Sequence, residues 1–209
     1  MPREGNLSAE KPAPRRRRSR TMGPFPVLPI RDHVYFPGSM ISVLVGRERS
    51  INAVNDAWEH GRMVVLVAQK SAETEDPDEA DLYQFGVMAE LMQVLRVPDG
   101  TVRVMADTSS RVRVAQYIEE GAYLAARVVM SPETTSDDIE TEGLMRLVRS
   151  EFEHIVHTGH QIAPEALLNV ASEAESNGLS FTILSNLGHV SVAARQEMLE
   201  TDDDKERLR

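Results

Sequence analysis

Three histidines spaced three residues apart are the most obvious candidates for chemistry. His154, His157 and His160 would partly share one face of a helix, so two imidazoles could bind one metal ion. Gly159 interrupts this geometry, and no carboxylate completes a metalloprotease motif. We therefore expect surface histidines near a helix end and no bound metal. A small hydrolase built on these histidines is the alternative.

The motifs for nucleotide and peptide hydrolysis are missing from the sequence. A phosphate-binding loop needs a lysine directly after a glycine, and Lys11, Lys70 and Lys205 all follow other residues. No glycine-rich segment surrounds a candidate serine with a partner lysine downstream. The chain also has no cysteine, which excludes a thiolate nucleophile. We expect a chain without catalytic activity and without a cofactor.

A predicted β-hairpin offers the best argument for a binding surface. Residues 97–102, Val-Pro-Asp-Gly-Thr-Val, supply turn geometry between two alternating strands. An uninterrupted first strand would have a core face consisting of Tyr83, Phe85, Val87, Ala89, Leu91, Leu95 and Val97. Pairing of residues 97 and 102 would bring Met105 opposite Val94 on the other face, and methionine side chains adapt to many apolar shapes. The predicted substrate-binding residues are Met88, Met92, Val94 and Met105. Coverage of this face by the helical half or by a neighbouring subunit is the alternative.

The hairpin belongs to the first of two parts of the chain, which differ in the spacing of their apolar residues. Short β-branched runs fill residues 26–131, and one helix with Ser50 as its cap and Gly61 as its end interrupts them. Trp58 on that helix is expected in the core. The expected strands are 27–30, 41–45, 64–68, 83–97, 102–106, 112–118 and 123–130.

From residue 137 onward the apolar period is that of helices. The first helix should end near Gly159 and the second should start at Pro164 and end at Asn177-Gly178; a third should end at Gly188, and Ser191 should cap a last one. Residues 202–204, three aspartates, are expected to form a solvated acidic segment. Strands followed by helices predict an α+β fold of two packed units.

Charge is distributed unevenly over the 209 residues, whose formal net charge is −10. Residues 1–22 carry +5 and the rest −15, so we expect a disordered basic tail on an acidic folded part. An acidic surface repels phosphate backbones, so nucleic acid is an unexpected partner except through the tail. No apolar stretch is long enough to span a membrane, and the lack of cysteine favours a cytoplasmic location.

Six short motifs in register resemble the amino-terminal domain of the ATP-dependent Lon protease. The motifs are Leu28-Pro29-Ile30-Arg31-Asp32, Phe36-Pro37-Gly38, residues 45–51 (VGRERSI), Val67-Ala68-Gln69-Lys70, residues 98–102 and Arg111-Val112-Arg113-Val114. Residues 196–200 and 206–208 resemble the point where that domain runs into its connecting helix. The chain departs from the family pattern at residues 107–110 (DTSS), where a glycine is usual, and at Gly188-His189, where Leu-Pro is common.

The resemblance implies a β-rich, PUA-like pseudo-barrel lobe with one helix over residues 23–133 and a small helical bundle over 134–209. It also implies a non-catalytic domain that captures unfolded or damaged proteins and helps to assemble a hexameric protease, whose Ser-Lys dyad is absent here. The stop after Arg209, inside an expected helix, predicts a piece of a longer protein. A free-standing adaptor or an RNA-binding PUA-like module is the alternative.

Overall fold

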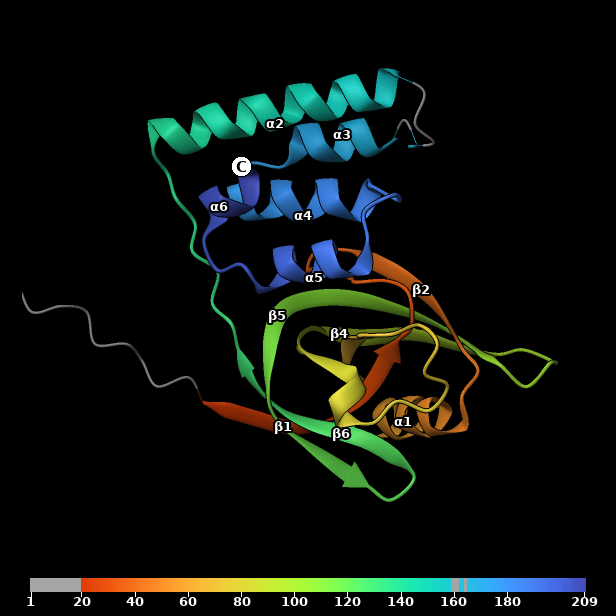
Figure 1. Ribbon diagram of the computed structural model, residues 1–209. Coiled ribbons are helices and arrows are strands. Elements are labelled where there is room, and N and C mark those ends of the chain that lie inside the picture. The colour runs from red at the N-terminus through yellow and green to blue at the C-terminus, as the bar shows by residue number, and fades with distance from the viewer. Residues whose placement is uncertain (1–19, 159–161, 164) are drawn as a thin grey trace, which may run out of the picture.

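The computed structural model describes residues 20–158, 162–163 and 165–209, which form a β-rich lobe below a stack of helices (Figure 1). The predicted α+β class is therefore confirmed. The elements are β1 Thr21–Ile30, β2 Met40–Val45, α1 Glu48–Glu59, β3 Met63–Gln69, η1 Glu79–Asp81, β4 Leu82–Arg96, β5 Val102–Glu120, β6 Tyr123–Met130, α2 Ile139–His157, α3 Glu165–Ser172, α4 Ser176–Asn186, α5 Val192–Glu200 and α6 Asp204–Leu208.

The six strands form one sheet in the order β2-β5-β4-β3-β1-β6, and an additional β5–β6 pairing closes it into a pseudo-barrel. The expectation of separate strands at 102–106 and 112–118 was wrong, because β5 continues through both as one strand of 19 residues. The polar residues between them do not form a turn. Thr108 is buried, and its hydroxyl hydrogen-bonds the carbonyl oxygens of Phe36 and Ser39 at 2.8 Å each.

The first strand begins earlier than the composition of the tail suggested. Thr21 and Met22 pair with Val129 and Val128 of β6, so they belong to the sheet and not to a disordered tail. The rest of the predicted tail, residues 1–19, lies outside the described residues.

Helix α1 starts before its predicted cap and leaves its tryptophan at the surface. Arg47 occupies the N-cap position, and Ser50 lies inside the helix and is buried. Trp58 is 37% exposed, with the Arg62 guanidinium 4.6 Å from its ring centroid. The helix buries its small residues Ala53, Val54 and Ala57 instead, which corrects the expectation of a tryptophan in the core.

Helix α4 contains the residues that were expected to break a helix. It begins at Ser176, so Asn177-Gly178 lie in its first turn and do not end the preceding helix as expected. The Asn177 side chain does not form a local turn, because its amide nitrogen donates to the Thr134 carbonyl and to the Thr135 hydroxyl at 3.0 Å each. Ser191 does cap α5 as predicted, since its side chain accepts a hydrogen bond from the Ala194 N–H.

The expectation of a solvated acidic segment at 202–204 was wrong for Asp204, which is buried, whereas Asp202 and Asp203 are exposed and each makes a structural contact. Asp202 pairs with Arg111 at 2.6 Å, and Asp203 caps α6. Asp204 is 1% exposed and accepts hydrogen bonds from the Ser136 N–H at 2.7 Å and from the Ser176 hydroxyl. Burial alone would raise the pKa of Asp204, but these hydrogen bonds outweigh it and lower the pKa.

A buried arginine joins the barrel to the helices. Arg111 of β5 is 1% exposed, and its guanidinium donates to the carbonyl oxygens of Leu199 at 2.9 Å and Thr201 at 2.8 Å. Nearby, the rings of Phe36 and Phe181 stack at 5.5 Å across the same junction. The lobe and the helices therefore share a packed polar and apolar interface.

Candidate functional site

The β4–β5 hairpin forms as predicted, but its register differs. The Val97 N–H donates to the Thr101 carbonyl, so Val94 pairs with Val104, and Met105 pairs with Gln93. Irregularities also interrupt the β4–β5 register between Met88 and Ala89 and between Leu91 and Gln93. The first irregularity adds Ser109 to β5, whereas the second adds Met92 to β4, so the β4 residues after Met92 change face.

The four predicted binding residues consequently do not share one surface. Met88 is only 4% exposed and packs in the barrel core with Val65 and Val112. Val94 points inward and packs against the core cluster that contains α1. Met92 and Met105 are exposed, at 50% and 36%. Only these two of the four residues remain available for contact with another molecule.

Another set of apolar side chains accompanies these two methionines. Strand β2 pairs with the first half of β5, so that Leu44 lies beside Arg103, which in turn lies beside Leu95 of β4. In the same way Ser42 lies beside Met105. Paired residues of neighbouring strands point to the same side of a sheet. We call this side of the β2–β5–β4 region the outer face; its large apolar residues are Met40, Leu44, Met92, Leu95 and Met105.

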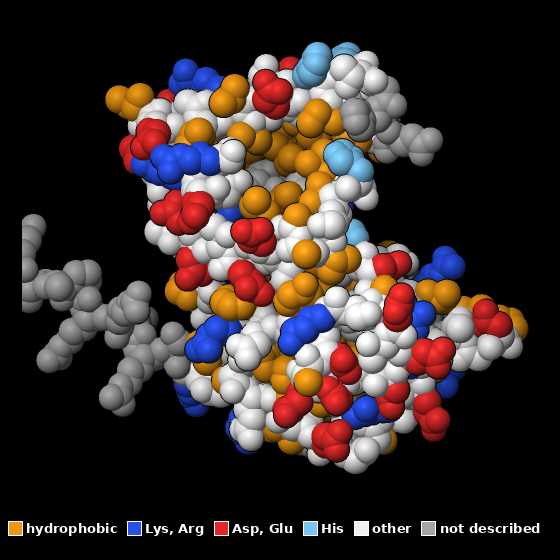
Figure 2. All heavy atoms as spheres, viewed as in Figure 1, with side chains coloured by type: hydrophobic (Ala, Val, Ile, Leu, Met, Phe, Trp, Pro, Cys, Tyr) orange, Lys and Arg blue, Asp and Glu red, His pale blue; other side chains and the backbone are white. Residues whose placement is uncertain are grey.

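The outer face is mixed in character. Its five apolar side chains are each between 36% and 59% exposed, and the polar residues Ser42, Gln93, Arg103 and Asp107 lie between them. Figure 2 shows hydrophobic side chains, interrupted by charged ones, along the hairpin that projects from the lobe. Exposed apolar residues gathered on one surface indicate a binding face. Three of the five are methionines, which adapt to different apolar partners.

Sequence reasoning missed Met40, Leu44 and Leu95. Alternation along residues 40–44 does show an exposed side, but it does not reveal that β2 pairs with β5, which is 57 or more residues away in the chain. Leu95 was assigned to the core face because the bulge near Met92 carries no sequence signature. The signal that remained visible was the number of methionines around the hairpin.

The histidines do not form a metal site within the part of the chain that the structure describes. His154 and His157 are exposed in the last turns of α2, and His157 Nδ1 lies 2.6 Å from the Glu153 carbonyl oxygen. His160 lies outside the described residues. Among the residues that are described, no three His, Cys, Asp or Glu side chains are grouped to hold a metal ion. None of the described helices is both long and apolar enough to cross a membrane.

A pseudo-barrel joined to a helical subdomain, with exposed apolar side chains on β2, β4 and β5, defines the α+β domain of this chain. The family model for the ATP-dependent protease La (LON) substrate-binding domain matches residues 24–209, so the chain belongs to this family. The resemblance deduced from the short motifs is thereby confirmed.

Relatives and solved structures agree with this assignment. The chain is 38% identical to Lon protease 3 of Sorangium cellulosum over 186 residues, and 36% identical to the Lon protease of Escherichia coli K12 over 183 residues. These matches cover 89% and 88% of this chain but only 22% and 23% of the relatives. The chain thus spans less than a quarter of their length.

Two solved structures share the fold. The N-terminal domain of the Mycobacterium avium complex Lon protease aligns with a TM-score of 0.68 at 21% identity, covering 88% of this chain and 93% of that one. A Lon N-terminal domain protein from Xanthomonas campestris aligns with a TM-score of 0.62 at 17% identity, covering 88% and 94%.

Proposed function

We propose that this chain is the substrate-recognition domain of a Lon-type ATP-dependent protease and binds unfolded or damaged proteins through the outer face. The observation that carries the proposal is the set of five exposed apolar side chains on neighbouring strands of one sheet. Unfolded chains expose the apolar residues that native proteins bury, so an apolar surface distinguishes them from folded proteins.

The domain itself performs no chemistry in this proposal. The outer face carries thioethers, aliphatic groups and a few polar side chains, none of which is arranged as a nucleophile with a base. Cleavage and ATP hydrolysis would belong to other domains of the parent protease, which would act in the cytoplasm. The acidic charge of the folded part disfavours nucleic acid as a partner.

A single outer face should bind weakly, because its apolar residues are dispersed among polar ones. A hexameric parent enzyme would present six such faces to one client. Tethered sites raise the effective concentration of each other, so weak individual contacts can hold a client firmly. Oligomer assembly is the second role that we propose for the domain within the parent.

The proposal is tested by replacing three outer-face residues with serine, as L44S/L95S/M105S. Association with a permanently unfolded, fluorescently labelled protein would be followed by anisotropy at two salt concentrations. We expect the affinity to fall about tenfold or more, equivalent to about 1.4 kcal/mol, and the wild-type affinity to persist in high salt.

The matched control removes three exposed apolar residues from the helical subdomain, as I139S/L147S/L168S. These side chains are 90%, 56% and 73% exposed, so the same number of apolar groups is lost without touching the sheet. We expect this control to bind like the wild type. Equal affinities of the two folded triple variants would contradict the assignment of the outer face.

A further inference from the structure

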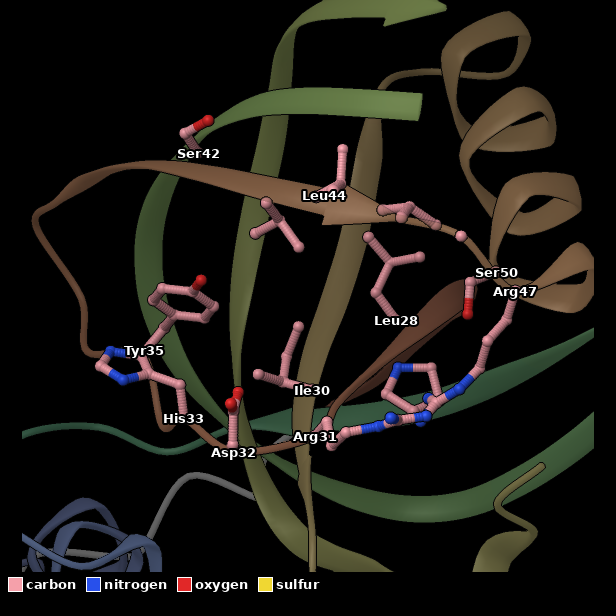
Figure 3. Close-up of a pocket in the computed structure, with 14 residues that line it drawn as sticks. Leu28, Ile30, Arg31, Asp32, His33, Tyr35, Ser42, Leu44, Arg47 and Ser50 are labelled. Atoms are coloured by element: carbon pink, nitrogen blue, oxygen red, sulfur yellow. The ribbon is translucent and has the colours of Figure 1, made fainter. Parts of the chain in front are cut away.

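A pocket of about 470 Å³ lies along the edge of β2, and the outer-face residues Ser42 and Leu44 contribute to its lining. The last residues of β1, the loop that follows them, β2 and the start of α1 line it (Figure 3). Leu28 and Ile30 point into it from β1, and Tyr35 lies near one end. Arg31 runs along the opposite side from β2 towards Arg47. The pocket thus combines an apolar wall with a cationic end.

The β2 edge exposes main-chain hydrogen-bonding groups to this pocket. Within the described residues, β2 pairs with β5 and with no other strand. The Thr108 N–H donates to the Ser39 carbonyl at 3.0 Å, which fixes the alternation along the antiparallel pair. Ser42 and Leu44 therefore direct their N–H and C=O groups away from β5, and both residues line the pocket. An unpaired edge of this kind can accept a further strand.

Strand β1 leaves a gap on the other side of the pocket. Its residues 27–30 pair with β3, while its pairing with β6 stops at Pro26. The closure of the barrel is carried by β5 and β6 alone. The described strands thus leave a seam between β2 and the end of β1, and the pocket lies in that seam.

The charged groups of the pocket favour an acidic ligand at one end. Arg47 donates to the neutral Gln69 side chain at 2.7 Å, and Arg31 forms no ion pair among the described residues. Burial and, second, the neighbouring Arg31 lower the pKa of Arg47, while Asp76 and Glu75, which do not line the pocket, oppose this by smaller amounts. Asp32 lies beside His33 in the pocket wall, and burial and, second, Arg195 lower the pKa of His33, which disfavours its cationic form. Two guanidinium groups therefore face one carboxylate in the lining.

We infer that an extended client segment adds to β2 as a further strand in this pocket and places one acidic side chain against Arg31 and Arg47. The inference rests on the proposed function and narrows the clients to segments that combine apolar and acidic residues. Main-chain hydrogen bonds would supply affinity independent of sequence, and the arginines would supply the preference for acid.

Labelled synthetic peptides of about eight residues, in alternating Val and Thr with one Glu near an end, test the inference on the full chain. A second peptide carries Gln in place of Glu, and a third carries N-methyl groups on alternate amides. We expect N-methylation to weaken binding at least tenfold and the Gln peptide to bind at least threefold more weakly at low salt. Unchanged binding of the N-methylated peptide would overturn strand addition, and unchanged binding of the Gln peptide would overturn the acidic preference.

Matched variants of the chain place the peptide at β2. S42P removes an N–H that does not serve the β5 pairing, and S42A keeps it, so we expect only S42P to lose the Glu peptide. Equal binding by both folded variants would refute the β2 edge as the position. Should S42P fail to fold, R31Q replaces it: R31Q must abolish the difference between the Glu and Gln peptides. Loss of unfolded-protein binding in L44S/L95S/M105S with normal peptide binding in S42P would leave the proposed function intact and remove this inference alone.

Discussion

The replacement of Arg111 by methionine tests whether one buried cation holds the lobe and the helices together. Its side chain is fully buried, and it donates to two carbonyl oxygens and to Asp202, whose side chain is 71% exposed. Removing the guanidinium leaves the Leu199 carbonyl without this donor, at about 1–3 kcal/mol. The Thr201 carbonyl loses one of two donors, at about 0.5–1.5 kcal/mol, because Arg207 also donates to it at 2.7 Å. Asp202 can regain water, so it adds little. Since methionine refills part of the space, we expect R111M to lose about 3 kcal/mol of unfolding free energy.

Urea unfolding followed by circular dichroism, with tryptophan fluorescence from the lobe, measures this loss. A loss of about 3 kcal/mol corresponds to a fall in Tm of about 6–12 °C for a chain of this size. The control D202N keeps Arg111 and its carbonyl bonds and changes only an exposed partner, so it should cost less than about 1 kcal/mol. The reasoning is refuted if R111M unfolds within 1 kcal/mol of the wild type, or if D202N costs as much as R111M.

Two further predictions concern pH and packing. The hydrogen bond from Lys205 is the largest cause that lowers the pKa of Asp138 to about 2. The stabilisation by this pair is therefore complete above the ordinary carboxyl pKa of about 4 and is lost as pH falls towards 2. The difference in urea midpoint between the wild type and K205M should shrink over that pH interval. A Cβ on Gly86 would lie 2.3 Å from the Leu66 carbonyl oxygen, so G86A should lower the unfolding free energy by about 2–3 kcal/mol. A Cβ on Gly143, inside α2, would meet no atom within 4 Å, so G143A should raise the unfolding free energy by about 0.5–1 kcal/mol in the same urea titration. A difference in urea midpoint between the wild type and K205M that does not change with pH would contradict the first prediction. A G86A variant as stable as G143A would contradict the second.

Much of the fold could be predicted from local patterns. Pro98-Asp99-Gly100 strongly favours a turn, and the hairpin forms there, with the Asp99 side chain accepting a hydrogen bond from the Thr101 N–H at 2.9 Å. Ser191 caps α5 because a hydroxyl at that position satisfies a free N–H whatever the tertiary context. Local chemistry of this kind is readable from residue type and spacing.

The residues that form the candidate site could not be predicted from local patterns. Bulges shift the facing of every residue beyond them, so Leu95 moved to the outer face and Val94 to the core. The buried role of Asp204 depends on hydroxyl and N–H donors 28 and 68 residues away in the chain. Such contacts arise only in the tertiary structure. From the sequence alone, a run of aspartates is more simply interpreted as solvated.

Strand β5 connects the outer face, the closure of the barrel and the helical junction at successive positions. Residues 102–107 of β5 pair with β2 and carry Met105 on the outer face, while residues 112–120 pair with β6 and close the barrel. Arg111 lies between these halves and is the residue that reaches the helices. Because one strand carries the three functions at successive positions, a substitution on the outer face leaves the closing half and the junction in register. Under the proposed function, the apolar residues of the face would therefore be free to change without loss of the fold, as a receptor for heterogeneous unfolded proteins requires.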